Sequence, residues 1–307
     1  MTSLTIRHVT TYRYRHPVAF GEHRMMLRPR DSHDQKVTEA RLGIPPQPSS
    51  LRFAEDAFGN HVAIAHFAES AAELSFESIV SIELSPAAAG LDLAENARTF
   101  PVSYDTGEMP ELAPCLQPLH PDPDGEIGRW ARQFVPEGEA APESIGTIEI
   151  LTRLSQAIHR GFRYRRREAK GIQPPLETLR LGHGSCRDFA LLMIEAARSL
   201  GLAARFASGY LAIPSEEAPS DAAPEPAAAA VVDTPHGATH AWAQIFLPGA
   251  GWVDFDPTCG SVGKTALVTV AVVPDPYDAT PLHGTFIGSA SDPLGMEVHV
   301  SVTSGDA

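Results

Sequence analysis

The chain has 307 residues, of which 43% are hydrophobic and 20% charged, and this composition predicts a soluble globular protein with material for two or three modest domains. Its formal net charge is −14, from 24 Lys and Arg against 38 Asp and Glu. Such an acidic chain argues against nucleic acid or an anionic membrane as the main partner.

Cysteine usage and the N-terminus predict the compartment. Cys115, Cys186 and Cys259 are widely spaced and odd in number, so we expect no disulfide framework and a reducing environment. The N-terminus lacks the basic start and apolar run of a signal peptide. No apolar stretch approaches the roughly 20 residues that span a bilayer. We therefore expect a cytoplasmic protein.

Residues 1–85 are predicted to form an N-terminal β module. Alternating, β-forming segments at 4–14, 37–44, 61–67 and 74–84 are separated by Pro, Asp, Gly and Asn. Short strands at this spacing are typical of a small β-sandwich. Its histidines are scattered, and we expect them to be structural or exposed: His8, His16, His23, His33, His61 and His66.

The next part, residues 86–146, is rich in proline and is interpreted as a connecting region with short helices, one of them near 127–134. Cys115 lies in it without a helix start or a nearby base, and is interpreted as incidental.

An amphipathic helix is predicted at 147–158, at the start of a core at 147–260. The basic run at 163–167 is interpreted as a solvated loop or strand edge.

A strand is predicted at 203–213. The Ala, Pro and Glu-rich segment 215–235 follows and is hypothesised to be a lid, because it ends just before His240. Residues 261–307 contain further short β-like segments, which we expect to complete one of the sheets.

A glycine-containing turn is predicted before Cys186, and Cys186 is predicted to lie at the start of the helix that follows. Gly184 allows a close, bent backbone. Ser185 is expected to be the N-cap, with Asp188 three residues later forming a capping box. Residues 189–200 are apolar nearly all round, as in a buried helix, and Arg198 and Gly201 are typical of its end. A thiol at the positive end of this helix is expected to be stabilised as a thiolate.

Two strands joined by a turn are predicted downstream, and alternation places three side chains on one face of each. The first face carries His240, Trp242 and Gln244, and the second carries Trp252, Asp254 and Asp256.

The length of the turn decides which aspartate meets His240. A five-residue turn at 246–250 would place Asp256 directly opposite His240, with Cβ atoms about 4.5–5.5 Å apart. A three-residue turn at 246–248 would instead place Asp254 there. The longer turn around Pro-Gly is the easier one, so we predict Asp256 as the partner and Asp254 as the second candidate.

These residues predict a Cys186–His240–Asp256 triad. A nucleophilic thiolate needs a base within reach and a third group that orients the base. The backbone N–H of Cys186 is a candidate oxyanion donor.

A metal site is the alternative from spacing. His183 with Cys186, and His236 with His240, have zinc-compatible spacings, and Cys259 could be a further ligand or a second thiol. The two pairs lie in different contexts and no CxxC is present, so we expect no metal and no organic cofactor, and a structural role for Cys259.

Several segments together resemble the bacterial transglutaminase-like family, whose core is similar to that of cysteine proteases. They are residues 182–190, 205–210, 239–246 and 251–258 in the core, and 8–14, 27–30 and 56–60 in the N-terminal module. The resemblance implies a papain-like α+β core after a β-sandwich-like module, with Cys186, His240 and Asp256 as the triad. The chain departs from the family pattern at two positions. Gln244 stands where the family usually has an acidic residue, and His183 is not the residue expected before Gly184.

The predicted function is acyl transfer through a thioester on Cys186. We expect hydrolysis of a peptide or amide bond, because no acceptor site for an amine can be identified. Protein-glutamine transamidation is the second alternative, and a non-catalytic binding or scaffold domain the third. The expected partner is a peptide or protein substrate carrying an amide, with no nucleic acid and no membrane. Site-shaping roles are expected for Trp242, Gln244, Asp254, Gly184 and Ser185.

Overall fold

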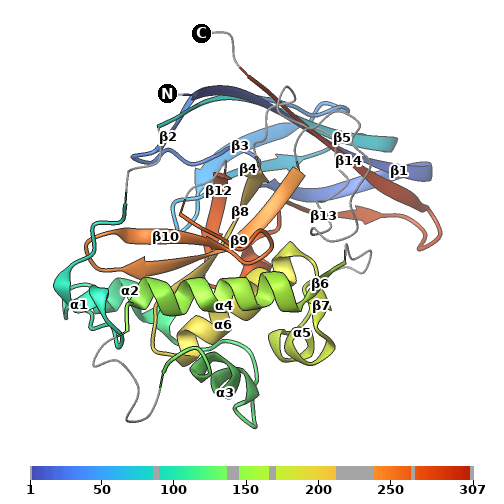
Figure 1. The fold of residues 1–307 in the computed structure, drawn as a ribbon. Coiled ribbons are helices and arrows are strands. Elements are labelled where there is room, and N and C mark those ends of the chain that lie inside the picture. The colour runs from blue at the N-terminus through green and yellow to red at the C-terminus, as the bar shows by residue number, and fades with distance from the viewer. Residues whose placement is uncertain are drawn as a thin grey trace, which may run out of the picture.

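The computed structural model describes residues 2–85, 90–136, 145–165, 171–211, 238–263 and 267–304. A β-rich N-terminal part lies above a core in which helices cover a second sheet (Figure 1). The predicted combination of an antiparallel β module with a mixed α+β core is therefore confirmed. No helix in the described part of the chain is long and apolar enough to cross a membrane.

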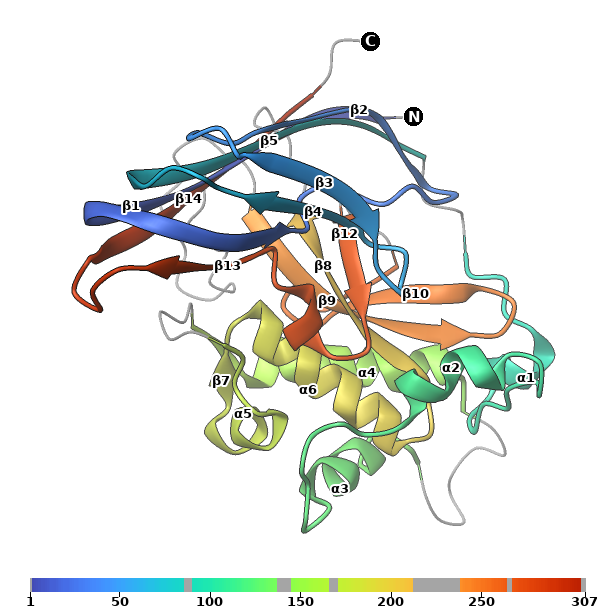
Figure 2. The ribbon, with the colours of Figure 1, turned by 180° about the vertical axis from the view of Figure 1, so that it is seen from behind.

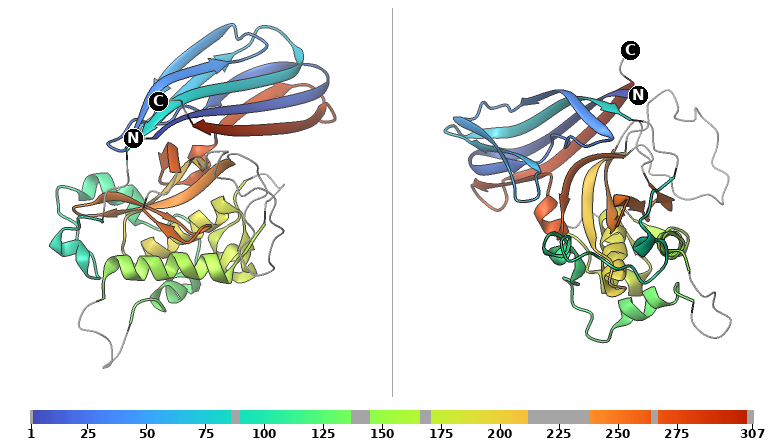
Figure 3. Two further views of the ribbon diagram at one scale, coloured as in Figure 1. Left: turned by 45° about the horizontal axis from the view of Figure 1, so that its top comes forward. Right: turned by 90° about the vertical axis from the view of Figure 1, so that its left-hand side faces the viewer.

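The N-terminal sheet is organised around one long strand. Its members are β1 (Thr2–Met25), β2 (Gln35–Gly43), β3 (Ser50–Glu55), β4 (His61–His66), β5 (Ala71–Leu84), β13 (Leu282–Ile287) and β14 (Pro293–Ser304). The first half of β1 pairs with β5 and β14, and its second half pairs with β4 and β13. Because β1 passes from one group of strands to the other, the module has the two layers of a sandwich (Figure 3).

The C-terminal strands extend two sheets, whereas the sequence led us to expect one. The strands β11 (Ser261–Val262) and β12 (Leu267–Val273) belong to the core sheet. After the short 3-10 helix η1 (Pro276–Ala279), the chain returns to the N-terminal module, where β13 and β14 pair with β1. Short local β patterns do not specify which sheet they join, since pairing over nearly 300 residues is set by tertiary packing.

The core sheet has the order β11-β10-β9-β8-β12 and is antiparallel throughout. Its central strands are β8 (Ala204–Leu211), β9 (Ala238–Leu247) and β10 (Gly251–Asp256). Helices α4 (Thr147–Gly161) and α6 (Cys186–Ser199) lie below it (Figure 2). The smaller elements are α1 (Glu95–Arg98), α2 (Met109–Leu116), α3 (Glu126–Arg132), α5 (Pro175–Leu181), β6 (Arg163–Tyr164) and β7 (His183–Gly184).

Helix α6 is the centre of the core, and every residue from 188 to 198 is buried. This includes Arg198, whose position near the helix end suggested only a stop signal. Its guanidinium forms a 2.8 Å ion pair with buried Glu195 and donates to three backbone carbonyls, those of Cys115, Ala204 and Pro274. Arg198 thus ties the Pro-rich region and β8 to α6, because a buried guanidinium is stable only when its donors are satisfied.

Two side-chain amides join the N-terminal module to the core. Strand β12 is the edge of the core sheet, and an unpaired strand edge leaves backbone donors and acceptors unsatisfied. Gln35 exchanges hydrogen bonds with the N–H and C=O of Thr269, and Asn60 does the same with Val272, all at 2.8–3.0 Å. Asp56 and Arg30 hold Asn60 in place through its side chain. Both of these residues belong to motifs noted in the sequence.

Replacing Asn60 by alanine is expected to destabilise the protein by about 1–3 kcal/mol, because it leaves the N–H and C=O of Val272 without partners in a buried interface. Urea unfolding followed by tryptophan fluorescence measures this loss. Asn96→Ala is the matched control, since Asn96 makes one exposed bond to the carbonyl of Ser103 and should change stability by less than about 0.5 kcal/mol. Equal losses in both variants would contradict the role assigned to Asn60.

Candidate active site

The Cys186 thiol lies at the first turn of α6, half-buried, as the sequence predicted. The Asp188 carboxylate accepts hydrogen bonds from the Ser185 N–H at 2.8 Å and from the Ser185 hydroxyl at 2.9 Å. Gly184 must lack a side chain, because a Cβ there would lie 2.8 Å from the Cβ of Asp188. Tight packing before the helix therefore fixes where the thiol emerges.

The pairing of β9 with β10 differs from both registers considered in the sequence. Leu247 pairs with Gly251, and Gln244 lies opposite Asp254, so the turn has three residues, 248–250. In this register position 258 would lie opposite His240, and Asp256 is two positions before it. The predicted partner is the one found, but the register argument for it was wrong. Asp256 reaches His240 as a diagonal neighbour, which long side chains can do across a pleated sheet.

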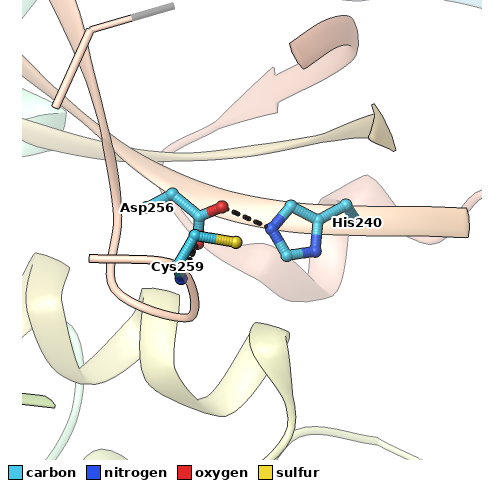
Figure 4. Close-up of side chains that lie close together, drawn as sticks. All are labelled: His240, Asp256 and Cys259. Carbon is cyan, nitrogen blue, oxygen red and sulfur yellow. Dashed lines mark hydrogen bonds and ion pairs between the residues drawn. The ribbon is translucent and has the colours of Figure 1, made fainter. Parts of the chain in front are cut away.

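The His240 imidazole and the Asp256 carboxylate form a buried pair. His240 is 8% exposed and Asp256 2%, and Nε2 of His240 lies 2.7 Å from Oδ2 of Asp256 (Figure 4). The other carboxylate oxygen accepts the backbone N–H groups of Thr258 and Cys259. Burial opposes the ionised form, but these bonds and the positive His240 outweigh it and hold the pKa of Asp256 below its ordinary value.

The Cys186 thiol interacts with the same imidazole. Burial alone would lower the pKa of His240, but hydrogen bonds to Asp256 and Cys186, together with the negative charges of both groups, raise it to about 10. The imidazole is therefore a cation at neutral pH. A cation beside a thiol at a helix N-terminus favours the thiolate. Since Nε2 is bonded to Asp256, Nδ1 is the nitrogen available to Cys186.

A second polar network supports the strand that carries His240. The Trp242 ring stacks on His240, with centroids 6.2 Å apart, and its Nε1 donates to Asp254 at 2.7 Å. Gln244 donates to the same oxygen of Asp254 and accepts from Arg205 at 2.8 Å. The structure thus places Asp254 away from His240, where it orients Trp242 and Gln244.

Cys259 also lies beside the pair. Its sulfur, the His240 nitrogen and an Asp256 oxygen all lie within 4.8 Å of one another (Figure 4). The residue is exposed, but partial burial of its thiol and the neighbouring Asp256 carboxylate raise the pKa of Cys259 to about 12, so it stays a thiol that can donate to Asp256.

The three donors could hold a thiophilic metal only after a rearrangement. Donor atoms bonded to tetrahedral zinc at 2.0–2.1 Å are roughly 3.3 Å apart. His240 and Asp256 are 2.7 Å apart, which is a hydrogen-bond distance. The residues present fit a hydrogen-bonded pair better than a metal site.

The candidate site opens into a cavity of about 80 Å³ between the core and the N-terminal module. Cys186, Arg187 and His240 line one side of it, and His8 and Met26 of the N-terminal module line the other. A larger cavity of about 320 Å³ lies within the N-terminal sandwich, but none of the predicted triad residues lines it. The smaller cavity is the candidate site because the predicted nucleophile and the predicted base line it.

His8 is a cavity residue that the sequence did not indicate. It is 3% exposed, hydrogen-bonds Tyr210 and Thr10 at 2.9 Å, and burial lowers its pKa to about 4, so it is neutral at pH 7. His8 and Tyr210 are separated by 202 positions in the sequence, so no local pattern could reveal the contact. A structural role for His8 agrees with the prediction, but it also forms part of the cavity wall.

The remaining sequence candidates lie elsewhere. His183 is on β7 and does not join any group of three potential metal ligands among the described residues. Cys115 is buried in α2, which the sequence did not predict, and its carbonyl binds Arg198. His236 and the hypothesised lid at 215–235 lie outside the described residues.

The fold and the site together define an α+β protein of the cysteine-protease-like class, with a cysteine at the start of a central helix and a His–Asp pair on the adjoining sheet. Residues 4–83 match the bacterial transglutaminase-like N-terminal region, and residues 134–257 match the transglutaminase-like superfamily core. The chain belongs to the bacterial transglutaminase-like family. These matches support a cysteine-dependent catalytic function and leave the particular reaction open.

Similar proteins agree with this assignment over the whole chain. Uncharacterized proteins of Mycobacterium bovis and Mycobacterium tuberculosis are each 30% identical to it over 322 residues, covering 98% of this chain and 93% of theirs. The crystal structure of a protein from Cytophaga hutchinsonii, provisionally named a cysteine protease, superposes with a TM-score of 0.70. It is 19% identical and covers 100% of this chain and 91% of its own, which establishes the shared fold.

Proposed function

We propose that this protein is a cysteine-dependent hydrolase that cleaves a peptide or amide bond, with Cys186 as nucleophile, His240 as general base and acid, and Asp256 as the group that orients His240. One observation carries the proposal: a buried His240 bonded to Asp256 on one side interacts with the Cys186 thiol on the other. An imidazole between a carboxylate and a thiol at a helix start is the arrangement that activates a nucleophilic cysteine.

The acylation step follows from this geometry. The Cys186 thiolate attacks the carbonyl carbon of the amide, and the electron pair moves to the oxygen. The backbone N–H of Cys186, at the positive end of α6, is a candidate donor to that oxygen. When the C–N bond breaks, the His240 imidazolium gives its proton to the departing amine. The product is a thioester on Cys186 and a free amine.

The deacylation step uses the same residues in the reverse sense. Once Cys186 is acylated it carries no negative charge, so one of the groups that raise the pKa of His240 is lost. The neutral imidazole, still held by Asp256, can then accept a proton from water. The water oxygen attacks the thioester carbon, the C–S bond breaks, and an acid and the Cys186 thiolate are released.

Transamidation would differ only in the second step, with an amine in place of water. The cavity beside Cys186 is small and largely apolar, and among its described lining residues there is no carboxylate that would bind a protonated amine. This supports hydrolysis as the first choice.

The three unpaired cysteines also support our placement of the protein in a reducing compartment such as the cytoplasm.

The experiment that tests the reaction incubates the full chain with a proteome-derived peptide library, with and without a fluorescent primary amine. Mass spectrometry then identifies the products, and Cys186→Ala is the control. Hydrolysis predicts new peptide termini or deamidated side chains that are absent with Cys186→Ala. Amine incorporation in place of these products would establish transamidation, and no product from either reaction would favour a binding role.

A further inference from the structure

One charged side chain that lines the candidate site forms no ion pair with a carboxylate among the described residues. Arg187 follows Cys186 directly in α6 and lines the same cavity. Its guanidinium carbon lies 5.9 Å from the centroid of the Phe206 ring, and one nitrogen lies 3.4 Å from the carbonyl oxygen of Pro276. Among the described residues, Arg187 forms no ion pair with a carboxylate.

The neighbouring carboxylate, that of Asp188, forms no ion pair with Arg187. Asp188 lies next to Arg187 in the chain, but its oxygens accept the N–H of Gln173 and the N–H and hydroxyl of Ser185. The guanidinium is partly shielded from water, and this burial lowers the pKa of Arg187 although the nearby charges of Cys186 and Asp188 act to raise it. A guanidinium has five donors, and leaving most of them without acceptors in a shielded position is costly.

The other shielded arginines of the core are satisfied, which makes Arg187 exceptional. Arg198 has Glu195 and three carbonyls, and Arg205 has Gln244 and lies 3.9 Å from the centroid of the Trp252 ring. Arg187 is also at the wrong end of its helix, because a cation in the first turn opposes the helix dipole. Residues that break a local rule without local compensation are often functional.

We propose that Arg187 is a specificity-determining residue that binds a carboxylate of the substrate close to the scissile amide, so that the preferred substrates are acidic peptides. This inference rests on the proposed function. A planar guanidinium binds a carboxylate through two parallel hydrogen bonds, which suits one anionic group beside the acyl carbon. Positive charge is local to the cavity: the Arg187 guanidinium and the His240 imidazolium face it in a chain of net charge −14.

Two small alkylating reagents test the proposal without knowledge of the natural substrate. Iodoacetate and iodoacetamide differ by a carboxylate in place of an amide, and both alkylate the Cys186 sulfur with release of iodide. Their rates are measured at neutral pH on the full chain, by mass spectrometry of the Cys186 peptide, and the same ratio is measured for a free thiol. We expect the wild-type ratio of iodoacetate to iodoacetamide to exceed the free-thiol ratio by about tenfold, the effect of about 1.4 kcal/mol.

The variants separate carboxylate binding from other roles of Arg187. Arg187→Gln is expected to lower the ratio several-fold, to the level that the His240 imidazolium alone sustains. Arg187→Lys is expected to lower it less, because lysine keeps the positive charge but not the planar guanidinium. Arg132→Gln, on the exposed part of α3, removes one positive charge away from the cavity and should leave the ratio unchanged. Thermal unfolding of each variant checks the fold.

The outcomes distinguish this inference from the proposed function. An unchanged ratio in Arg187→Gln, or equal losses of both rates, would overturn carboxylate binding, since equal losses indicate an effect on the thiolate alone. A wild-type iodoacetamide rate no higher than that of a free thiol would instead overturn the proposed function. The two readouts, ratio and absolute rate, are independent.

Discussion

Cys186→Ala is expected to lower the formation of hydrolysis products by more than about 10⁴-fold while leaving the fold intact. The sulfur is the only atom of the protein that forms a covalent bond to the acyl group in the proposed mechanism. Alanine is a good helix former at the first turn of α6, and it keeps the Cβ of a side chain that is only half-buried where it packs against the core. The peptide-library assay measures the products, and thermal unfolding measures the stability.

The matched control for this substitution is Cys115→Ala, which removes a buried thiol from α2, away from His240. It should retain activity and lose some stability, because it leaves a small cavity. Activity that survives in Cys186→Ala would refute a covalent role for Cys186. A Cys186→Ala protein that fails to fold would show that the thiol has a structural role that the geometry does not reveal.

Asp256→Asn is expected to reduce activity by roughly 10³- to 10⁴-fold, and Asp254→Asn by less than about tenfold. Of the two aspartates, only Asp256 bonds the His240 imidazole, so its replacement lowers the pKa of His240 and frees the ring to adopt the wrong tautomer. An asparagine at 254 keeps an oxygen that can accept from Trp242 and Gln244. Initial rates of both variants, at matched fractions of folded protein, provide the comparison.

The pH profile of Asp256→Asn adds a second readout. In the wild type, the pKa of His240 is raised to about 10, so the imidazolium persists through neutral pH and is lost only as the pH rises through that value. Without Asp256, the loss should occur at lower pH. Equal activity losses at 254 and 256, or a larger loss at 254, would contradict the assignment of Asp256 as the orienting residue.

The sequence predicted the residues of the site better than the pairing that brings them together. A two-residue change of register keeps every side chain on its face, so alternation alone placed His240 and Asp256 correctly. The predicted length of the turn was wrong because contacts outside the hairpin set it. Gly249 has φ of +90°, and a Cβ there would lie 2.4 Å from the backbone nitrogen of Ala94, whose N–H donates to the carbonyl of Pro248. The tight turn is fixed by packing against a segment 150 residues earlier.

Long-range contributions to the site had no signal in the sequence. His8 and Met26 line the cavity because the N-terminal module packs against the core, partly through the bonds of Gln35 and Asn60 to β12. Such pairing between side-chain amides and a strand edge follows no periodicity. Arg198 was similarly misjudged, since a basic residue near a helix end usually remains in solvent, and here tertiary packing buried it with Glu195.

The most direct test of a poised Cys186–His240 pair is the pH dependence of iodoacetamide labelling at Cys186, in the wild type and in His240→Ala. We expect a wild-type rate that is already high near about pH 6–7, and a His240→Ala rate that rises only near the free-thiol pKa of about 8.5. If the wild-type rate also rises only near that pKa, Cys186 is not held as a thiolate by His240, and a binding or scaffold role would replace the catalytic one.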